Sequence, residues 1–195
     1  NLRKLDFEAM RDSLLVFSGK LDPQRGGKPI NLTDEPYSYR RSVYGYVDRG
    51  NLPELMQQFD FPDPEMTNSK RASTVVPQQA LFLMNNPMVI DVARLMVARR
   101  EFRDAKDDAG RIAALYRIVF QRAPQDAETR LGMDYVNEAL VDPVPHGGFT
   151  GIRPDAPKRG FEGGRGGTLA PVRNQGEMVA RSQLSPWERY AQALL

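Results

Sequence analysis

Apolar side chains recur at helical spacing near the start of the chain. Phe7, Met10 and Leu14 follow one another at intervals of three or four residues. This spacing places them on one face of a helix. Gly19 comes next, and glycine is the residue that most readily adopts the left-handed conformation at a helix end. The pattern predicts an amphipathic helix over residues 3–18.

Proline and the apolar pattern together predict the later helices. A proline suits the first turn of a helix, where its missing N–H is not needed, and it breaks a helix interior. The short gap at 121–125 predicts two helices that run antiparallel. In chain order, the predicted helices are 53–59, 77–98 with a break at Pro87, 109–140 with a break at 121–125, and 186–195.

Two stretches depart from this helical pattern. Residues 37–47 hold four of the seven tyrosines together with two valines, and these residue types favour strands. Residues 142–182 hold nine of the sixteen glycines and five of the fifteen prolines. Such a segment buries too little apolar surface to offset the entropy lost on ordering. The sequence therefore predicts a short β element near 37–47 and a flexible Gly/Pro-rich insertion at 142–182.

These elements predict a mainly α fold, a multi-helix domain with a short β element and a long Gly/Pro-rich loop. The chain starts and ends inside helical patterns, so we interpret residues 1–195 as a single domain fragment cut at both ends. Apolar faces near Phe7, Leu14, Trp187 and Leu194 are then expected to contact flanking domains of the same polypeptide or a protein partner.

Composition narrows the chemistry that this chain can perform. It contains no cysteine, which removes thiol nucleophiles, zinc–thiolate clusters and a CxxCH haem attachment. The only histidine is His146, so a His-based metal site or a Ser–His pair would depend on that residue alone. We predict no metal site and no cofactor in this chain. The longest apolar runs are far too short to cross a bilayer, so no transmembrane segment is expected.

The low net charge of the chain also argues against nucleic acid as a partner. The formal net charge is only +2, which gives little general attraction to phosphate backbones. The stretch "FEGGRGG", residues 161–167, resembles an arginine–glycine tract but contains a single arginine. A flexible loop is the simpler interpretation.

The first helix carries a candidate acid–base pair. Glu8 and Asp12 lie one turn apart, with Arg11 beside them. Two neighbouring carboxylates can split their pKa values and act as acid and base. The alternative is an ion-pair network in which Lys4, Arg11 and one of the arginines at 40 and 41 neutralise them.

The "YRRSVYGYVDR" stretch supplies candidate binding residues. In a strand, Arg40 and Arg41 would point to opposite faces, so one could hold an internal carboxylate while the other meets an anionic ligand. Tyr44 could stack on a sugar ring or take part in a cation–π contact. Arg49 adds a further cation at this place. The alternative is a tyrosine-rich strand whose arginines hold loops in place.

Asp48 stands at the start of a turn that the pattern "DRGN" predicts. Asn51 is expected to cap the helix that Pro53 opens. Asp48 is therefore either a turn residue or a third candidate carboxylate for acid–base chemistry.

Four segments occur in this order: "RKLDFEAMRDSLLVFSGKLD", "RRSVYGYVDRGNLPELMQQFDFPDP", "TVVPQQALFLMNNPMV" and "SPWERYAQALL". Together they resemble the planctomycete domain of unknown function 1553, found toward the C-terminus of large exported proteins. Relatives often carry a cytochrome c domain upstream, and some add sugar-binding or immunoglobulin-like modules. The resemblance implies an exported, periplasmic or cell-surface location and a haem c on an upstream domain of the full-length protein. It implies no catalytic residues, because the family has none established.

Two functional hypotheses follow. The first is a non-catalytic scaffold or binding module of a larger exported, cytochrome-c-linked protein, connected with redox or polysaccharide processing. The second is a polysaccharide-acting enzyme domain that uses the carboxylates of Glu8, Asp12 and Asp48 with the arginine cluster at an anionic carbohydrate. Carboxylates at glycosidase separations in a cleft would favour the enzyme, and buried, salt-bridged carboxylates would favour the scaffold.

Overall fold

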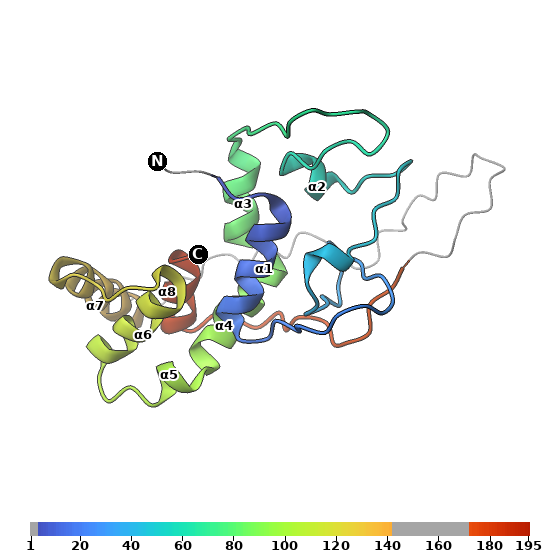
Figure 1. Ribbon diagram of the computed structural model, residues 1–195. Coiled ribbons are helices and arrows are strands. Elements are labelled where there is room, and N and C mark those ends of the chain that lie inside the picture. Colours follow the sequence, from blue (N-terminus) through green and yellow to red (C-terminus); the bar gives the residue numbers. More distant parts are fainter. Residues whose placement is uncertain (1–3, 142–171) are drawn as a thin grey trace.

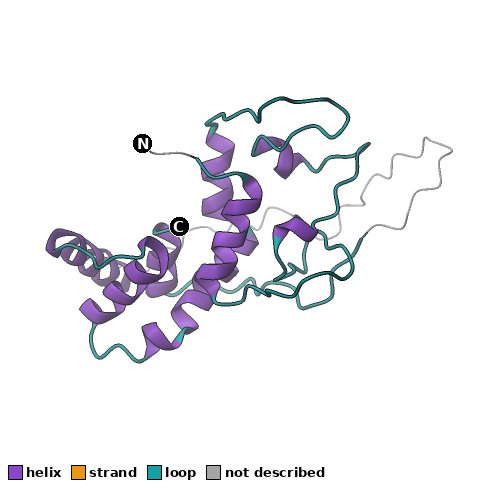
Figure 2. Cartoon of the chain, in the orientation of Figure 1, coloured by secondary structure: helices purple, strands orange, loops and turns teal. Residues whose placement is uncertain are grey.

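The fold is mainly helical, as the sequence predicts. A computed structural model describes residues 4–141 and 172–195. In that part of the chain, helices are the only regular elements, and turns or irregular segments of very different length join them (Figure 2). In chain order they are α1 (Phe7–Ser18), the 3-10 helix η1 (Ser42–Tyr44), α2 (Glu54–Gln58), α3 (Pro77–Asn85), α4 (Pro87–Ala98), α5 (Arg100–Arg103), α6 (Asp108–Phe120), α7 (Asp126–Val141) and α8 (Pro186–Ala193).

Local signals set several of these helix ends. Gly19 ends α1 in the left-handed conformation, at φ 71°, and donates its N–H to the Val16 carbonyl. The side chain of Asn86 caps α4 by accepting from the Met88 N–H at 2.9 Å. Pro87 begins α4, so α3 and α4 meet at a bend of 50°. The predicted break at Pro87 is confirmed.

The later helices also begin at caps. The side chain of Asp107 accepts from the Gly110 N–H at 2.7 Å and opens α6. Ser185 and Glu188 form a reciprocal capping box at the start of α8. The predicted cap at Asn51 is wrong: α2 follows Pro53, and no side chain caps it.

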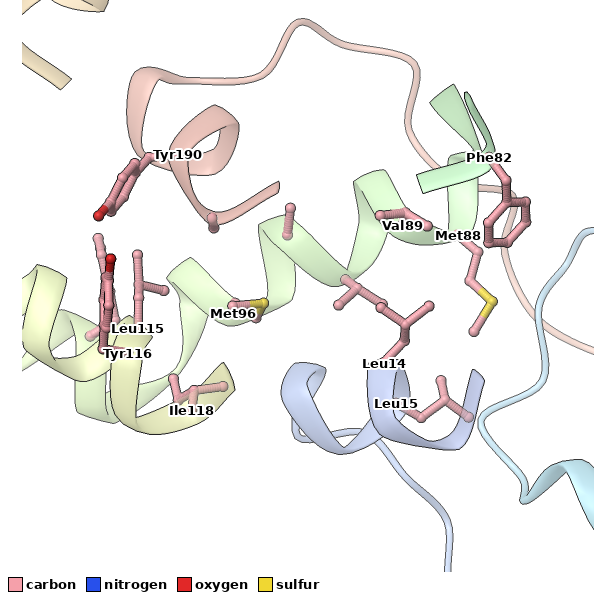
Figure 3. Packing of buried hydrophobic residues seen from close by; sticks show 14 of the residues in the cluster. Leu14, Leu15, Phe82, Met88, Val89, Met96, Leu115, Tyr116, Ile118 and Tyr190 are labelled. Carbon is pink, nitrogen blue, oxygen red and sulfur yellow. The ribbon is translucent and has the colours of Figure 1, made fainter. Parts of the chain in front are cut away.

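The core forms around α4, which lies between α1 and α8 (Figure 1). Val89, Val92, Ala93 and Met96 give α4 a fully buried stripe. Figure 3 shows Leu14 of α1 on one side of that helix, with α8 on the other. The stripe residues recur at a spacing of three or four, which places them on one face of the helix.

The predicted β element is reduced to two isolated bridges. Asp22 pairs with Arg40 and Ile30 with Gly45, each in parallel orientation, and residues 42–44 form η1. Side chains from α1 hold the backbone groups that a strand ladder would need, as described below. Strand propensity is therefore overridden here by tertiary contacts.

The predicted insertion falls largely outside the described residues, since 142–171 are not described. His146 and the stretch 161–167 lie in that part. Residues 172–185 run without helix back past the first half of the chain to α8 (Figure 1). We call residues 172–185 the strap. The Asn174 side chain accepts from Asn31 N–H at 2.9 Å and donates to the carbonyls of Asn31 and Pro36.

Two of the apolar residues expected to face a partner are covered by this chain instead. Phe7 and Leu14 are 1% and 3% exposed, so that prediction is wrong for both. Their helix packs on α4 within the same core. Trp187 and Leu194 are only partly buried and pack at the margin of that core.

Taken singly, the described helices fall short of a membrane span. None of them is by itself long and apolar enough to cross a bilayer. Only α3 and α4 taken together, across their bend, reach the required length and composition.

Candidate functional site

Arg11 is the centre of the predicted cluster, and it is buried. Only 1% of its surface is exposed. Its guanidinium donates to the carbonyls of Arg40 and Ser38 at 3.0 and 2.5 Å, and to Ser42 Oγ at 3.2 Å. Burial lowers the pKa of Arg11 to about 10, although Asp12 partly opposes this, so the side chain stays charged at neutral pH. Arg11 thus fastens residues 38–42 to α1.

Asp12 completes this attachment from the next position of α1. Its Oδ1 accepts from both the backbone N–H and the hydroxyl of Ser42, each at 2.7 Å. Arg41 approaches the other oxygen, with Nε 3.6 Å from Oδ2. The carboxylate thereby holds the start of η1, and Arg41 is the arginine that meets an internal carboxylate.

Glu8 lies one turn before Asp12 but has different partners. Arg71 forms two parallel hydrogen bonds to its carboxylate, at 2.8 and 2.6 Å. This bond to Arg71 lowers the pKa of Glu8, against the opposing effect of burial. The same guanidinium stacks over the Phe61 ring at 5.2 Å. Glu8 and Asp12 are therefore on one helix yet in separate networks.

Arg40 points away from Asp12, toward the loop before it. Its guanidinium donates to the Lys28 carbonyl at 2.7 Å and to the Gly26 carbonyl. It also lies over the Tyr44 ring, 4.3 Å from the centroid, and the Tyr44 hydroxyl accepts from the Gly26 N–H. The predicted cation–π contact is present, and it closes a loop.

Asp48 and Arg49 lie apart from these networks at the surface. The Asp48 carboxylate accepts from the Gly50 N–H at 3.0 Å, which makes it a turn residue. Arg49 is exposed and forms no ion pair with any described residue. The structure thus unites Arg11, Asp12 and Arg41, and leaves Asp48 and Arg49 outside the group.

A second polar cluster lies where the strap crosses residues 35–39, and the sequence interpretation missed it. Glu35 accepts from Arg181 of the strap at 2.7 Å, and its side chain is only 9% exposed. Its Oε2 is buried without a hydrogen-bond partner in the described part of the chain. Burial raises the pKa of Tyr37 to about 12, and Glu35 adds to the effect.

Asp91 of α4 belongs to the same cluster. Burial raises its pKa, and so does the nearby charge of Glu35, whereas Arg94, the Tyr39 hydroxyl and Lys20 lower it. Arg94 also donates to the strap carbonyls at 180 and 182. An aspartate between the apolar positions of α4 was the one signal in the sequence for this cluster.

Asp91→Asn is expected to be more stable than the wild type at pH 7. The pKa of Asp91 is higher in the folded chain than in the unfolded chain, so protonation stabilises the fold and this contribution is lost as the pH rises through the folded pKa. Below about pH 3.9 the residue is protonated in both states and the difference should vanish. Thermal unfolding at pH 7 and pH 3 measures this, with exposed Asp134→Asn as the control. Equal melting temperatures at pH 7 would contradict the expectation.

A third cluster ties the N-terminal segment to the connection before α3. Lys4 Nζ lies 2.6 Å from Asp60 Oδ2, and Thr74 donates to the same carboxylate through its N–H and hydroxyl. Burial opposes ionisation, but the bonds from Lys4 and Thr74 prevail and lower the pKa of Asp60 to about 2.

No group of three or more metal-ligating side chains occurs among the residues that the structure describes.

Comparison with known proteins adds one match. The profile of PSD1, described as a protein of unknown function (DUF1553), matches residues 1–136. That range contains every residue of the Arg11, Asp12 and Glu8 networks. Searches of curated proteins and of solved structures return no match to this chain.

Proposed function

The chain belongs to the PSD1 family of proteins of unknown function (DUF1553), and from its internal contacts we propose that it is a non-catalytic scaffold or binding module. In this proposal it is part of a larger exported protein that carries haem c on an upstream domain. Its task is to position redox or polysaccharide-processing domains. Partners are the flanking domains or another protein, with carbohydrate as a further candidate ligand.

One observation carries this proposal. The two carboxylates on α1 that an enzyme would need, Glu8 and Asp12, are occupied by internal hydrogen bonds from Arg71 and Ser42. A general acid or base must reach a substrate proton at hydrogen-bond distance. Side chains that hold the fold together are poorly placed for that task. Bidentate and backbone-directed bonds of this kind are instead suited to fixing a rigid surface.

The alternative function is a polysaccharide-acting enzyme domain. Asp48 is the predicted carboxylate that remains most accessible, since it is exposed and engaged only by the Gly50 N–H. Arg41 and Arg49 lie close to Asp48 in the sequence, and both are exposed. In this alternative they would bind an anionic sugar. This arrangement supplies one carboxylate, whereas glycoside hydrolysis ordinarily uses two.

Cross-linking mass spectrometry of the full-length protein tests the scaffold. We expect cross-links from exposed Lys70 and Lys106 to other domains of the polypeptide or to a bound protein. A full-length protein without any such cross-link would overturn the proposal. So would release of reducing ends from anionic polysaccharides that is lost in a folded Asp48→Asn variant. Glycan-array binding that disappears in Arg41→Ala and Arg49→Ala would make carbohydrate the partner.

A further inference from the structure

A groove of about 660 Å³ separates the C-terminal end of α1 and the α5 turn from α6. Its volume lies within the range of roughly 300–1,000 Å³ that is usual for ligand sites. The groove residues contributed by α6 and its C-terminal cap are Gly110, Ala114, Arg117, Ile118 and Gln121. These positions recur at helical spacing, so one face of α6 forms the whole wall.

The shape of the groove fits an extended chain. From Gly110 to the cap residue Gln121, the groove follows α6 for about 16 Å, the length of roughly five extended residues. Gly110 and Ala114 are small and leave the hollow open, while Ile118 is only 8% exposed and belongs mainly to the core. Val16 of α1 lines the same groove and is 48% exposed.

The acidic residues of the groove are already neutralised. Glu101 pairs with Arg99 at 2.7 Å, and Asp104 lies 3.7 Å from Arg100. Arg99 also donates to the carbonyls of Val16 and Phe17, at 3.2 and 3.0 Å. These bonds tie the start of α5 to the end of α1, so the wall opposite α6 is formed in advance of binding.

Two cations of the groove are not neutralised in this way. Lys106 precedes α6, and Arg117 lies near its C-terminal end. Both are exposed, and neither forms an ion pair with another described residue. The uncompensated charge of the groove is thus positive at both of its ends. Complementary charge on a ligand would steer it into this orientation.

We propose that this groove binds an extended acidic segment of a protein partner. Carboxylates at the two ends of the segment pair with Lys106 and Arg117, and apolar side chains between them cover the exposed side chain of Val16. A polyuronate would share the negative charge, but it has no aliphatic side chains for this surface. The inference rests on the proposed function as a binding module and names the partner's chemistry.

Fluorescence anisotropy tests whether the two groove cations bind an acidic peptide. The probe is a labelled hexapeptide, Glu-Glu-Leu-Ala-Glu-Glu, and it is titrated with the 195-residue chain. We expect saturable binding that weakens about tenfold or more in the Lys106→Glu, Arg117→Glu double variant. The matched control, Lys70→Glu with Arg130→Glu, changes two exposed cations outside the groove and should bind like the wild type. A peptide with lysine in place of each glutamate should not bind.

A second variant tests whether the peptide binds in this groove. Val16→Trp fills the groove from the half-exposed wall of α1 and should abolish peptide binding while the circular dichroism spectrum is unchanged. Binding that survives Val16→Trp, or that falls equally in the control double variant, would overturn the proposal. Binding of polygalacturonate by a chain that does not bind the peptide would also overturn it. None of these results decides whether the chain is a scaffold, because the cross-linking experiment tests that proposal separately.

Discussion

Arg11→Met is expected to lower the free energy of unfolding by about 3–5 kcal/mol, because it removes one partner of a buried charged network. The carbonyls of Ser38 and Arg40 and the hydroxyl of Ser42 would lose their donor. Each buried polar group left without a partner costs about 1–3 kcal/mol. Urea denaturation at pH 7, followed by circular dichroism, measures the loss.

Arg41→Met is the matched control for this prediction. It also removes an arginine charge beside Asp12. The Arg41 side chain, however, is 57% exposed, and its Nε lies 3.6 Å from Asp12 Oδ2. An exposed pair of this kind contributes about 1 kcal/mol or less. Equal losses in the two variants would show that the buried network around Arg11 has no special part in stability.

Gly132→Ala is expected to destabilise the chain by about 1–3 kcal/mol through overpacking. A glycine inside a helix such as α7 normally costs about 1 kcal/mol relative to alanine, so helix propensity alone predicts a gain. A methyl group at Gly132 would lie 2.4 Å from the Tyr190 hydroxyl oxygen and 3.0 Å from Ile112 Cδ1. Both neighbours are buried, at 6% and 0% exposure, and cannot easily move.

A double-mutant cycle with Tyr190→Phe isolates the cause. Removing the hydroxyl removes the closest atom, so Gly132→Ala should cost less in the Tyr190→Phe background than in the wild type. We expect a coupling of about 1 kcal/mol, measured by urea denaturation of all four proteins. Purely additive effects would mean that the Tyr190 hydroxyl is not the cause of the destabilisation by a methyl group at residue 132.

Many helix boundaries were predictable because their causes are local. Gly19, Pro87 and Ser185 act on backbone groups within about one helical turn. The buried stripe of α4 was also readable, since its spacing is a property of four nearby residues. The failed cap at Asn51 shows the limit of this reasoning: a capping residue type is present, but the backbone turns into α2 only after Pro53.

The candidate site was predictable only in part. The sequence indicated that Glu8, Arg11 and Asp12 share the first helix, and the structure confirms that position. It indicated only one of their partners, an arginine at 40 or 41, and Arg41 does lie beside Asp12. Their hydrogen-bond partners lie 27 to 63 residues away in the chain. Glu35 and Asp91 were missed for the same reason, since their proximity depends on how residues 35–39 pack against α4 and the strap.

The sequence alone determined the helical class, several helix ends and the family, because each depends on patterns within short segments. The tertiary structure decided what the charged residues of the 37–47 region do. Arg11 and Asp12 capture backbone groups there that a strand would need, and Arg40 closes a loop. Such choices depend on burial and on contacts between remote segments. Local propensity cannot specify them, because it contains no information about which distant element will supply the partner.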